Sequence, residues 1–244
     1  MALDELPEVV QLELAVVTLP ESHPAAEFGR TVPVHGFLIR HSDGPILVDT
    51  GVGFGNEFID DRYEPTRTEL GVALADHGVA LDEIVAVVNS HLHFDHCGQN
   101  PTLFDSTTAF YAQGAEIDTV EADEYYTDRR WALGPSAQQR VVNGDEEIAD
   151  GVKILATPGH TAGHQSVLIQ NGDECVVVGA QLAWNADEIE AEIASSANVD
   201  AIAELQRAAA DSIRRIKALH PKTIYLSHCS PYQPVGSPPP TTQP

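Results

Sequence analysis

The chain is poor in positive charge and in long apolar segments. Lys and Arg number 13 against 37 Asp and Glu in 244 residues, which gives a formal net charge of -24. Such a surface repels nucleic acid and anionic membranes, so we expect neither as a partner. No apolar run approaches the roughly 18 residues that a membrane helix needs, so we expect no membrane span.

Lysine is especially scarce, since it occurs only at positions 153, 217 and 222. Strong acidity with few lysines is typical of a host with a salty cytoplasm, where an acidic surface keeps proteins soluble. It is equally typical of an acidic protein from a GC-rich genome, and the sequence leaves both explanations open.

Cysteine is scarce too. Cys97, Cys175 and Cys229 form no C-x-x-C pair, and their odd number argues against a disulfide framework. The first ten residues are acidic and lack the basic-then-apolar layout of a signal peptide. We therefore expect a cytoplasmic protein.

Patterning predicts a single domain over residues 1–230, followed by a flexible Pro-rich tail over 231–244. Apolar runs bounded by turn residues predict strands, and helical spacing predicts helices at 66–76 and 187–219, the second with a cap signal at Asn198. Residues 105–124 predict a short strand and then a helix. The remaining strands are expected at 9–19, 34–40, 45–48, 83–88, 152–156, 165–170, 175–178 and 222–227.

One segment carries an unusual density of metal-binding side chains. His91, His93, Asp95 and His96 lie within six residues, directly after a predicted buried strand. Imidazole and carboxylate are good ligands for zinc and similar ions. An extended backbone points His91 and His93 the same way, and a turn at Asp95-His96 lets these two face a second ion. The pattern predicts a metal site.

Three separate predicted strands lead into a histidine, at His91, His160 and His228. Loops that follow strand ends can converge at one edge of a sheet. The metal site is therefore expected to draw ligands from distant parts of the chain.

The run His91-x-His93-x-Asp95-His96 resembles the signature of the metallo-β-lactamase superfamily. Three further segments resemble other motifs of that family, in the same order: Asp49-Thr50-Gly51, Thr157-Pro158-Gly159-His160-Thr161 and Ser227-His228. The resemblance implies an α+β fold, a four-layer αβ/βα sandwich with two divalent metal ions at one edge. Zinc is the expected metal, with manganese, iron and cobalt as alternatives.

Within that superfamily the chain is most similar to N-acyl homoserine lactonases, which are quorum-quenching enzymes. Residues 91–100, HLHFDHCGQN, resemble their H-L-H-F-D-H-A-G-G-N, and residues 157–166, TPGHTAGHQS, resemble their T-P-G-H-T-P-G-H-Q-S. The resemblance implies that His91, His93 and His160 hold one ion, and that Asp95, His96 and His228 hold the other.

Two positions depart from the lactonase pattern. Gln181 stands where the family places an aspartate that bridges both ions, and a neutral amide should weaken the second site. Trp184 stands where the lactonases often carry a tyrosine that contacts the substrate carbonyl; its indole N–H offers one donor with different geometry.

Other polar residues near these motifs are expected to hold the ligands or their loops in place. We expect Asp49 to orient a ligand histidine, because metal-bound imidazoles usually donate their other N–H to a partner; a plain turn aspartate is the alternative. His164 is expected to support its loop rather than bind metal. Cys97 and Cys229 are expected to be small buried residues and not ligands.

The expected function is metal-dependent hydrolysis of a small lactone or other carboxylic ester. In this mechanism a metal-bound hydroxide attacks the carbonyl carbon, and Asp95 passes a proton to the leaving oxygen. Two alternatives stay open: a thioester, β-lactam or phosphodiester hydrolase, and a metal-binding protein with little hydrolytic activity because of Gln181. The sequence does not choose between a monomer and a homodimer.

Overall fold

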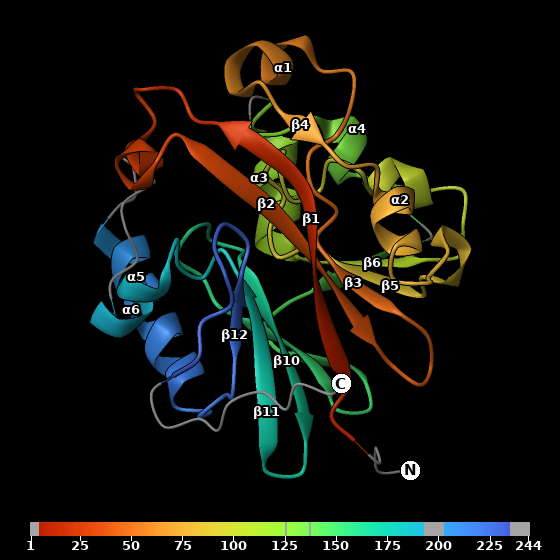
Figure 1. Cartoon of the computed structure of the whole chain (residues 1–244), viewed down its shortest axis with the longest axis vertical. Helices are drawn as coiled ribbons and strands as arrows, with labels where there is room; N and C mark the ends of the chain where they lie inside the picture. Colours follow the sequence, from red (N-terminus) through yellow and green to blue (C-terminus); the bar gives the residue numbers. More distant parts are fainter. Residues whose placement is uncertain (1–4, 125, 137, 193–202, 235–244) are drawn as a thin grey trace.

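The computed structural model describes residues 5–124, 126–136, 138–192 and 203–234. Its first sheet has seven strands in the order β4-β1-β2-β3-β5-β6-β7 (Figure 1). Their bounds are β1 Glu8–Thr18, β2 Thr31–Arg40, β3 Ile46–Val48, β4 Thr66–Arg67, β5 Ala86–Val88, β6 Ala109–Gln113 and β7 Gln139–Val142.

The second sheet has five strands in the order β12-β11-β10-β9-β8. Their bounds are β8 Glu146–Ala149, β9 Val152–Ala156, β10 Gln165–Asn171, β11 Glu174–Ala180 and β12 Ile224–Leu226. The β10–β11 hairpin turns at Gly172, whose φ of 58° suits a residue without a Cβ atom. Every strand predicted from the sequence is present, with small shifts at its ends, while the short strands β4, β7 and β8 were not predicted.

The helices complete a four-layer sandwich (Figure 1). Alternate residues of each strand face opposite sides, so Phe37 and Ile39 of β2 pack toward the second sheet, while Leu38 packs outward toward Leu70 and Leu74. On the second sheet, outward-facing residues pack against the helices that follow β11. The αβ/βα fold predicted from the motifs is confirmed. The helices are α1 Glu57–Tyr63, α2 Leu70–Ala75, α3 Gly114–Ala122, α4 Arg129–Ala132, α5 Ala186–Ala191 and α6 Ala203–Lys217.

Strand direction decides where the predicted ligands meet. β3, β5 and β6 are parallel to one another, and β11 is parallel to β12. β9 and β11 both pair antiparallel with β10, so they also run in a common direction. The loops that follow these strands come together at one edge, where the amide N–H of Gln165 donates to Ser90 O over 2.8 Å and joins the two sheets.

The helix predicted over 66–76 is wrong in its first part. Thr66 and Arg67 pair with β1 instead, and the Arg67 guanidinium donates to Gly53 O over 2.7 Å and to Asp60. The helix begins only at Leu70, whose N–H donates to Gln99 Oε1 over 2.8 Å. These are contacts between distant segments, which local helical spacing does not encode.

Two other predicted segments are only partly described. Within the helical segment expected at 187–219, α5 ends at Ala191, and Glu192 after it lies in the left-handed region. α6 spans Ala203–Lys217, and the cap predicted at Asn198 lies outside the described residues. The tail predicted at 231–244 is described only to residue 234, and Tyr232 bridges to Ile224.

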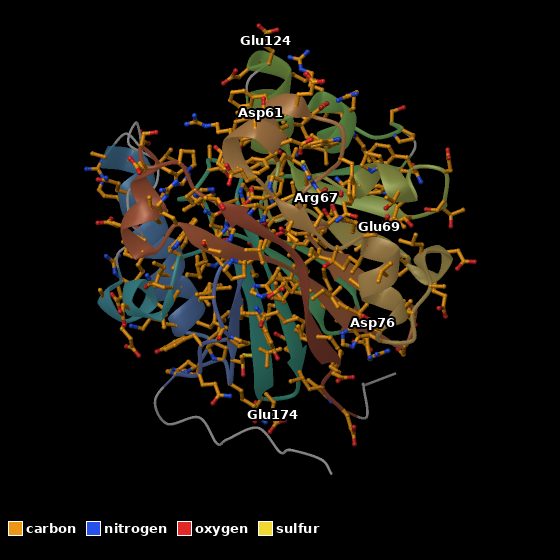
Figure 2. The ribbon with its side chains drawn as sticks, turned by 45° about the horizontal axis from the view of Figure 1, so that its top comes forward. Asp61, Arg67, Glu69, Asp76, Glu124 and Glu174 are labelled. Carbon is orange, nitrogen blue, oxygen red and sulfur yellow. The ribbon has the colours of Figure 1, made fainter. Side chains whose placement is uncertain are left out.

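Many acidic residues lie on the surface, whereas Asp49, Glu116 and Glu188 are buried. Glu124 and Glu174, at the top and bottom of the view in Figure 2, are exposed, and so are Asp61, Glu69 and Asp76. None of the helices in the described part of the chain has both the length and the apolar character needed to cross a lipid bilayer.

Candidate metal centre

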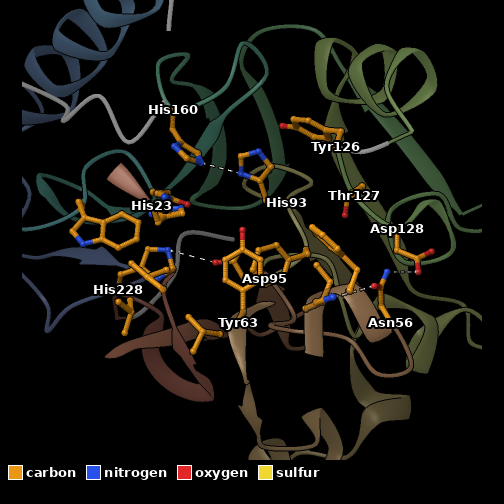
Figure 3. Close-up of a pocket in the computed structure, with 18 of the residues that line it drawn as sticks. His23, Asn56, Tyr63, His93, Asp95, Tyr126, Thr127, Asp128, His160 and His228 are labelled. Atoms are coloured by element: carbon orange, nitrogen blue, oxygen red, sulfur yellow. Dashed lines mark hydrogen bonds and ion pairs between the residues drawn. The ribbon is translucent and has the colours of Figure 1, made fainter. Parts of the chain in front are cut away.

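Six predicted ligands meet where the two sheets open at one edge, and Figure 3 shows four of them: His93, Asp95, His160 and His228. The loop after β5 brings four of them, the loop after β9 brings His160, and the loop after β12 brings His228. They form two groups whose ligand atoms lie within 4.8 Å of one another. The groups are His91, His93 and His160, and Asp95, His96 and His228.

The first group consists of imidazoles alone. His93 Nδ1 lies 3.0 Å from His91 Nε2 and 3.0 Å from His160 Nε2. The rings of His91 and His160 stand edge to face, with centroids 4.7 Å apart. Three nitrogens turned toward one point offer the tripod that a tetrahedral ion takes from a protein, with a fourth position left for another ligand.

The second group mixes a carboxylate with two imidazoles. Asp95 Oδ2 lies 3.7 Å from His96 Nε2 and 3.7 Å from His228 Nε2. His228 Nε2 is buried and has no hydrogen-bond partner. Burial of an unpaired nitrogen is costly unless something else binds it, so this orphaned atom fits a metal ligand.

In three of the rings, those of His91, His96 and His228, the Nδ1 atom has a partner in the protein. His96 Nδ1 lies 2.8 Å from Asp49 Oδ2, and His228 Nδ1 donates to Pro33 O over 2.9 Å. Ser90 Oγ donates to Asp49 over 2.7 Å and lies 3.0 Å from His91 Nδ1, from which it can accept. These contacts fix the tautomers so that the Nε2 lone pairs point into the site.

Electrostatics favour neutral rings in the first group. Burial lowers the pKa of His91 and His160 well below the usual histidine value, and neighbouring imidazoles lower it further. Burial also lowers the pKa of His228 to about 4, against the opposing effect of Asp95. A neutral imidazole keeps the lone pair that a metal ion needs.

Asp95 and His96 shift the other way. Burial raises the pKa of Asp95, but the imidazoles of His96 and His228 outweigh burial and leave it below its ordinary value. Burial lowers the pKa of His96, but the carboxylates of Asp95 and Asp49 outweigh it and leave the pKa raised. Asp95 is therefore an ionised carboxylate, the form that binds a cation.

A profile of the metallo-beta-lactamase superfamily matches residues 29–228, a span that contains both ligand groups. The chain belongs to this superfamily. The family predicted from the motifs is confirmed.

Individual relatives within the superfamily include lactonases. An N-acyl homoserine lactonase from Bacillus sp. is 34% identical over 151 residues, which cover 57% of this chain and 59% of that protein. A probable metallo-hydrolase from Mycobacterium tuberculosis is 27% identical over 180 residues, or 62% of this chain and 56% of that protein. These matches therefore span less than two thirds of each relative.

Solved structures match over more of the chain. A quorum-quenching N-acyl homoserine lactone lactonase aligns with 93% of this chain and 94% of its own at 25% identity, with a TM-score of 0.74. A second structure is an N-acyl homoserine lactone hydrolase with N-hexanoyl-L-homoserine at its catalytic metal center. It aligns with 91% of this chain and 93% of its own, at 25% identity and a TM-score of 0.73.

Gln181, which the sequence predicted in the place of a bridging aspartate, lies at the second group. Its Oε1 is 3.1 Å from His96 Nε2, and the side chain is only 7% exposed. It follows Ala180, whose φ of 50° is strained for a residue with a Cβ atom. This backbone turn directs the Gln181 amide to the centre. The sequence predicted Gln181 near both groups, and its hydrogen-bond contact is with His96 of the second group.

The predicted supporting residues also lie at the centre. Asp49 accepts the N–H of Ser90 over 2.7 Å, and its Oδ2 lies 2.8 Å from His96 Nδ1, a contact that can hold the ring in place. His164 Nδ1 donates to Thr157 O over 2.9 Å, and its Nε2 is buried without a hydrogen-bond partner. The indole of Trp184 stacks on His228, with ring centroids 4.5 Å apart.

The cysteines contribute to neither group of potential ligands. Cys97 is fully buried, and its thiol donates weakly to Leu92 O over 3.5 Å and His93 O over 3.4 Å. Burial raises the pKa of the Cys97 thiol, which disfavours the thiolate that metals bind. Cys229, expected to be buried, is only partly so.

A cavity of about 820 Å³ opens beside the ligands (Figure 3). One wall carries four of the predicted ligands, His93, Asp95, His160 and His228, together with Gln181 and Trp184. An apolar part is formed by side chains of β1, β2, α1 and the metal-site loop: Val17, Leu19, Val32, Phe58, Ile59, Tyr63 and Phe94. A polar part is formed by His23, Asn56, Glu124, Tyr126, Thr127, Asp128 and Arg129. A pocket of this size can hold a small organic molecule.

Three residues at the centre were missed from the sequence. His23 lines the cavity, and its Nδ1 accepts the N–H of Ala25 over 3.2 Å. Tyr126 also lines it, with its ring centroid 4.7 Å from that of His93. Glu116 is 1% exposed and accepts hydrogen bonds from both loops. Each is a single polar residue outside any motif, so spacing gave no signal for it.

Proposed function

We propose that the chain is a metal-dependent hydrolase that opens a lactone or cleaves another small carboxylic ester. The observation that carries this proposal is the pair of ligand groups on the wall of one cavity. The similarity to N-acyl homoserine lactonases supports an ester bond as the target, and the apolar part of the cavity suits an acyl chain.

In this proposal each ligand group holds one divalent ion. The residues fit such ions, because the rings of the first group are neutral and the second group offers an ionised carboxylate and the orphaned Nε2 of His228. Nitrogen and carboxylate donors in this mixture favour zinc, with manganese, iron and cobalt as alternatives. Gln181 adds a neutral amide oxygen beside His96, so we propose that the second ion is held less tightly.

The chemistry divides between the ions and the chain. Bound divalent ions lower the pKa of water toward neutrality and polarise a carbonyl group. Asp95 lies between the imidazoles of the second group, where its ionised carboxylate can take up a proton and deliver it to the leaving oxygen. Asp49 and Ser90 hold the rings of His91 and His96 in place during these steps.

His23 is the donor that we propose for substrate binding. Because its Nδ1 accepts a backbone N–H, the ring carries its proton on Nε2 when neutral. The ring lies in the cavity wall near Trp184, with centroids 6.4 Å apart. An Nε2–H there can donate a hydrogen bond to a carbonyl oxygen or amide of the substrate.

A panel of four substrate classes tests this function. Metal-loaded protein is offered N-acyl homoserine lactones, p-nitrophenyl esters, nitrocefin and bis-p-nitrophenyl phosphate, each with added zinc or manganese. We expect hydrolysis of the lactones or the esters. Activity only on nitrocefin or the phosphodiester would replace the proposed substrate class. No turnover of any class would favour a metal-binding protein that Gln181 has made inactive.

A further inference from the structure

Glu116, in the first turn of α3, is a buried carboxylate with four hydrogen-bond donors, two on each oxygen. Oε2 accepts the amide of Leu92 over 3.0 Å and the hydroxyl of Tyr126 over 2.7 Å. Oε1 accepts the amide of Gly163 over 3.2 Å and the hydroxyl of Thr161. A carboxylate has about four lone-pair positions, so every one of them is used.

These four donors come from the segments around the three-histidine group. Leu92 stands between His91 and His93, and Thr161 follows His160 directly. Tyr126 packs its ring on His93. Within the described residues, no hydrogen bond joins Glu116 to a ligand of the second group. One side chain thus ties together both loops that carry the first group.

The loop after β9 also lies unusually close to this residue. A Cβ atom on Gly163 would stand 2.6 Å from Glu116 N and 2.7 Å from Glu116 Cγ, so the approach depends on glycine. The distance between the two segments is therefore set by packing as well as by hydrogen bonds. Movement of the carboxylate would move the backbone on both sides of the first group.

Charge gives Glu116 a second effect. The first group has three neutral imidazoles and no carboxylate of its own, whereas the second has Asp95. A divalent ion held by imidazoles alone is stabilised by a buried negative charge behind the ligands, where the dielectric constant is low. Glu116 supplies such a charge next to both loops without lining the cavity itself.

We propose that Glu116 is a positioning residue that sets the affinity of the three-histidine group for its ion, and not that of the second group. This inference rests on the two-ion site of the proposed function. It does not depend on which substrate is hydrolysed.

Glu116→Gln makes the inference testable with an almost isosteric change. Oε1 faces the amide of Gly163 and Oε2 faces the amide of Leu92, so the new NH₂ meets a backbone N–H whichever way it turns. One of the two loops must therefore lose its bond, and the negative charge is lost as well. Changes at buried partners of this kind lower metal affinity by about 10- to 100-fold.

The experiment uses the full chain loaded with ¹¹³Cd²⁺, whose NMR signal distinguishes a three-nitrogen site from one with a carboxylate. Chelator competition then gives the affinity of each site. In Glu116→Gln we expect the signal of the three-histidine group to shift and its affinity to fall at least tenfold, with less than threefold change at the second group. Tyr126→Phe and Thr161→Val, which remove one donor each and keep the charge, should give smaller losses at the same group.

Equal loss at both groups, or no loss at the first, would overturn the inference, because a general structural role does not select one group. If Glu116→Gln fails to fold, the two single-donor variants decide in its place: unchanged affinity in both counts against the inference. A wild-type chain that binds no Cd²⁺ overturns this inference and the proposed function together. A wild-type chain that binds two ions but hydrolyses nothing overturns only the proposed function.

Discussion

Gln181 is the residue that we predict to replace a bridging aspartate, and its Oε1 lies 3.1 Å from Nε2 of His96 in the second group. Replacing its amide with a carboxylate adds a charged ligand beside His96. Gln181→Asp should therefore bind the second ion at least about tenfold more tightly, a change of about 1.4 kcal/mol. Chelator competition on the purified protein measures this affinity.

Gln181→Asn is the matched control, since it shortens the side chain equally without adding charge. It should not gain affinity. Equal affinity in the aspartate and asparagine variants would mean that charge at this position does not limit metal binding. Hydrolysis rates of the same variants show whether the glutamine is a handicap or part of the chemistry.

His164 carries a prediction about pH. Burial lowers its pKa from 6.5 to about 3, so below pH 6.5 the unfolded chain takes up a proton that the folded chain does not. The free energy of unfolding should be highest above pH 6.5 and fall as the pH drops toward 3, by about 1.4 kcal/mol per pH unit for this histidine.

Urea unfolding of the metal-free protein at pH 7, 6 and 5 measures this slope. His164→Asn removes the titrating group and should make the decline shallower by about that amount. Parallel curves for the variant and the wild type would contradict a neutral, buried His164.

At the scale of single residues, the sequence predicted side chains that stand in motifs. His91, His93, Asp95, His96, His160 and His228 were all predicted, and all meet in two groups. Glu116 and His23 were not predicted, because their importance comes only from contacts that folding creates between distant segments. The sequence predicted that Gln181 stands at the metal centre. It did not predict the contact between Gln181 Oε1 and His96 Nε2, which depends on how distant segments pack.

Among the elements, the loops after β3 and β5 approach each other so closely that only glycine fits. A Cβ on Gly98 would stand 1.9 Å from Gly53 N and 2.6 Å from Gly51 O, which are backbone atoms that cannot rotate away. Gly98→Ala should therefore push the ligand loop away from the Asp49 turn. We expect a loss of about 2 kcal/mol or more of stability, together with weaker metal binding.

Gly71→Ala in α2 is the control, because its Cβ would meet only the flexible side chain of Leu81, at 3.1 Å. Alanine also favours a helix over glycine, so this variant should be tolerated. Thermal unfolding with and without metal compares the two. A Gly98→Ala chain as stable as Gly71→Ala would contradict the close approach.

Elements were predicted best where a buried apolar run stands between turn residues, as in β5, β9 and β10. They were predicted poorly where tertiary contacts decide. Thr66 and Arg67 have helical spacing with the residues that follow, yet they pair with β1 because Arg67 is held by Gly53 and Asp60. A local pattern cannot report such a contact.

The whole molecule carries a formal net charge of -24, and its carboxylates crowd the surface (Figure 2). Repulsion between like charges opposes the compact state and is screened by salt. Raising NaCl from about 0.1 to about 2 M should therefore raise the Tm by several degrees, where 1 kcal/mol corresponds to about 2–4 °C for a chain of this size.

Differential scanning calorimetry in NaCl, beside sucrose at equal osmolality, separates screening from general solute effects. A strong rise in NaCl alone favours adaptation to a salty cytoplasm. A Tm that stays level or falls with NaCl would leave the acidity as a property of composition alone.

The central claim, that bound ions make this chain a hydrolase of lactones or esters, is tested most directly by proton release. Each ester bond opened near neutral pH yields a carboxylate and at least one proton, which a pH-stat counts. With N-hexanoyl homoserine lactone, or a p-nitrophenyl ester in its place, we predict turnover by zinc- or manganese-loaded protein. Turnover should stop on chelation, return on reloading and be absent in His93→Ala. Chelated protein as active as loaded protein, or loaded protein no faster than buffer on either substrate, would contradict the account.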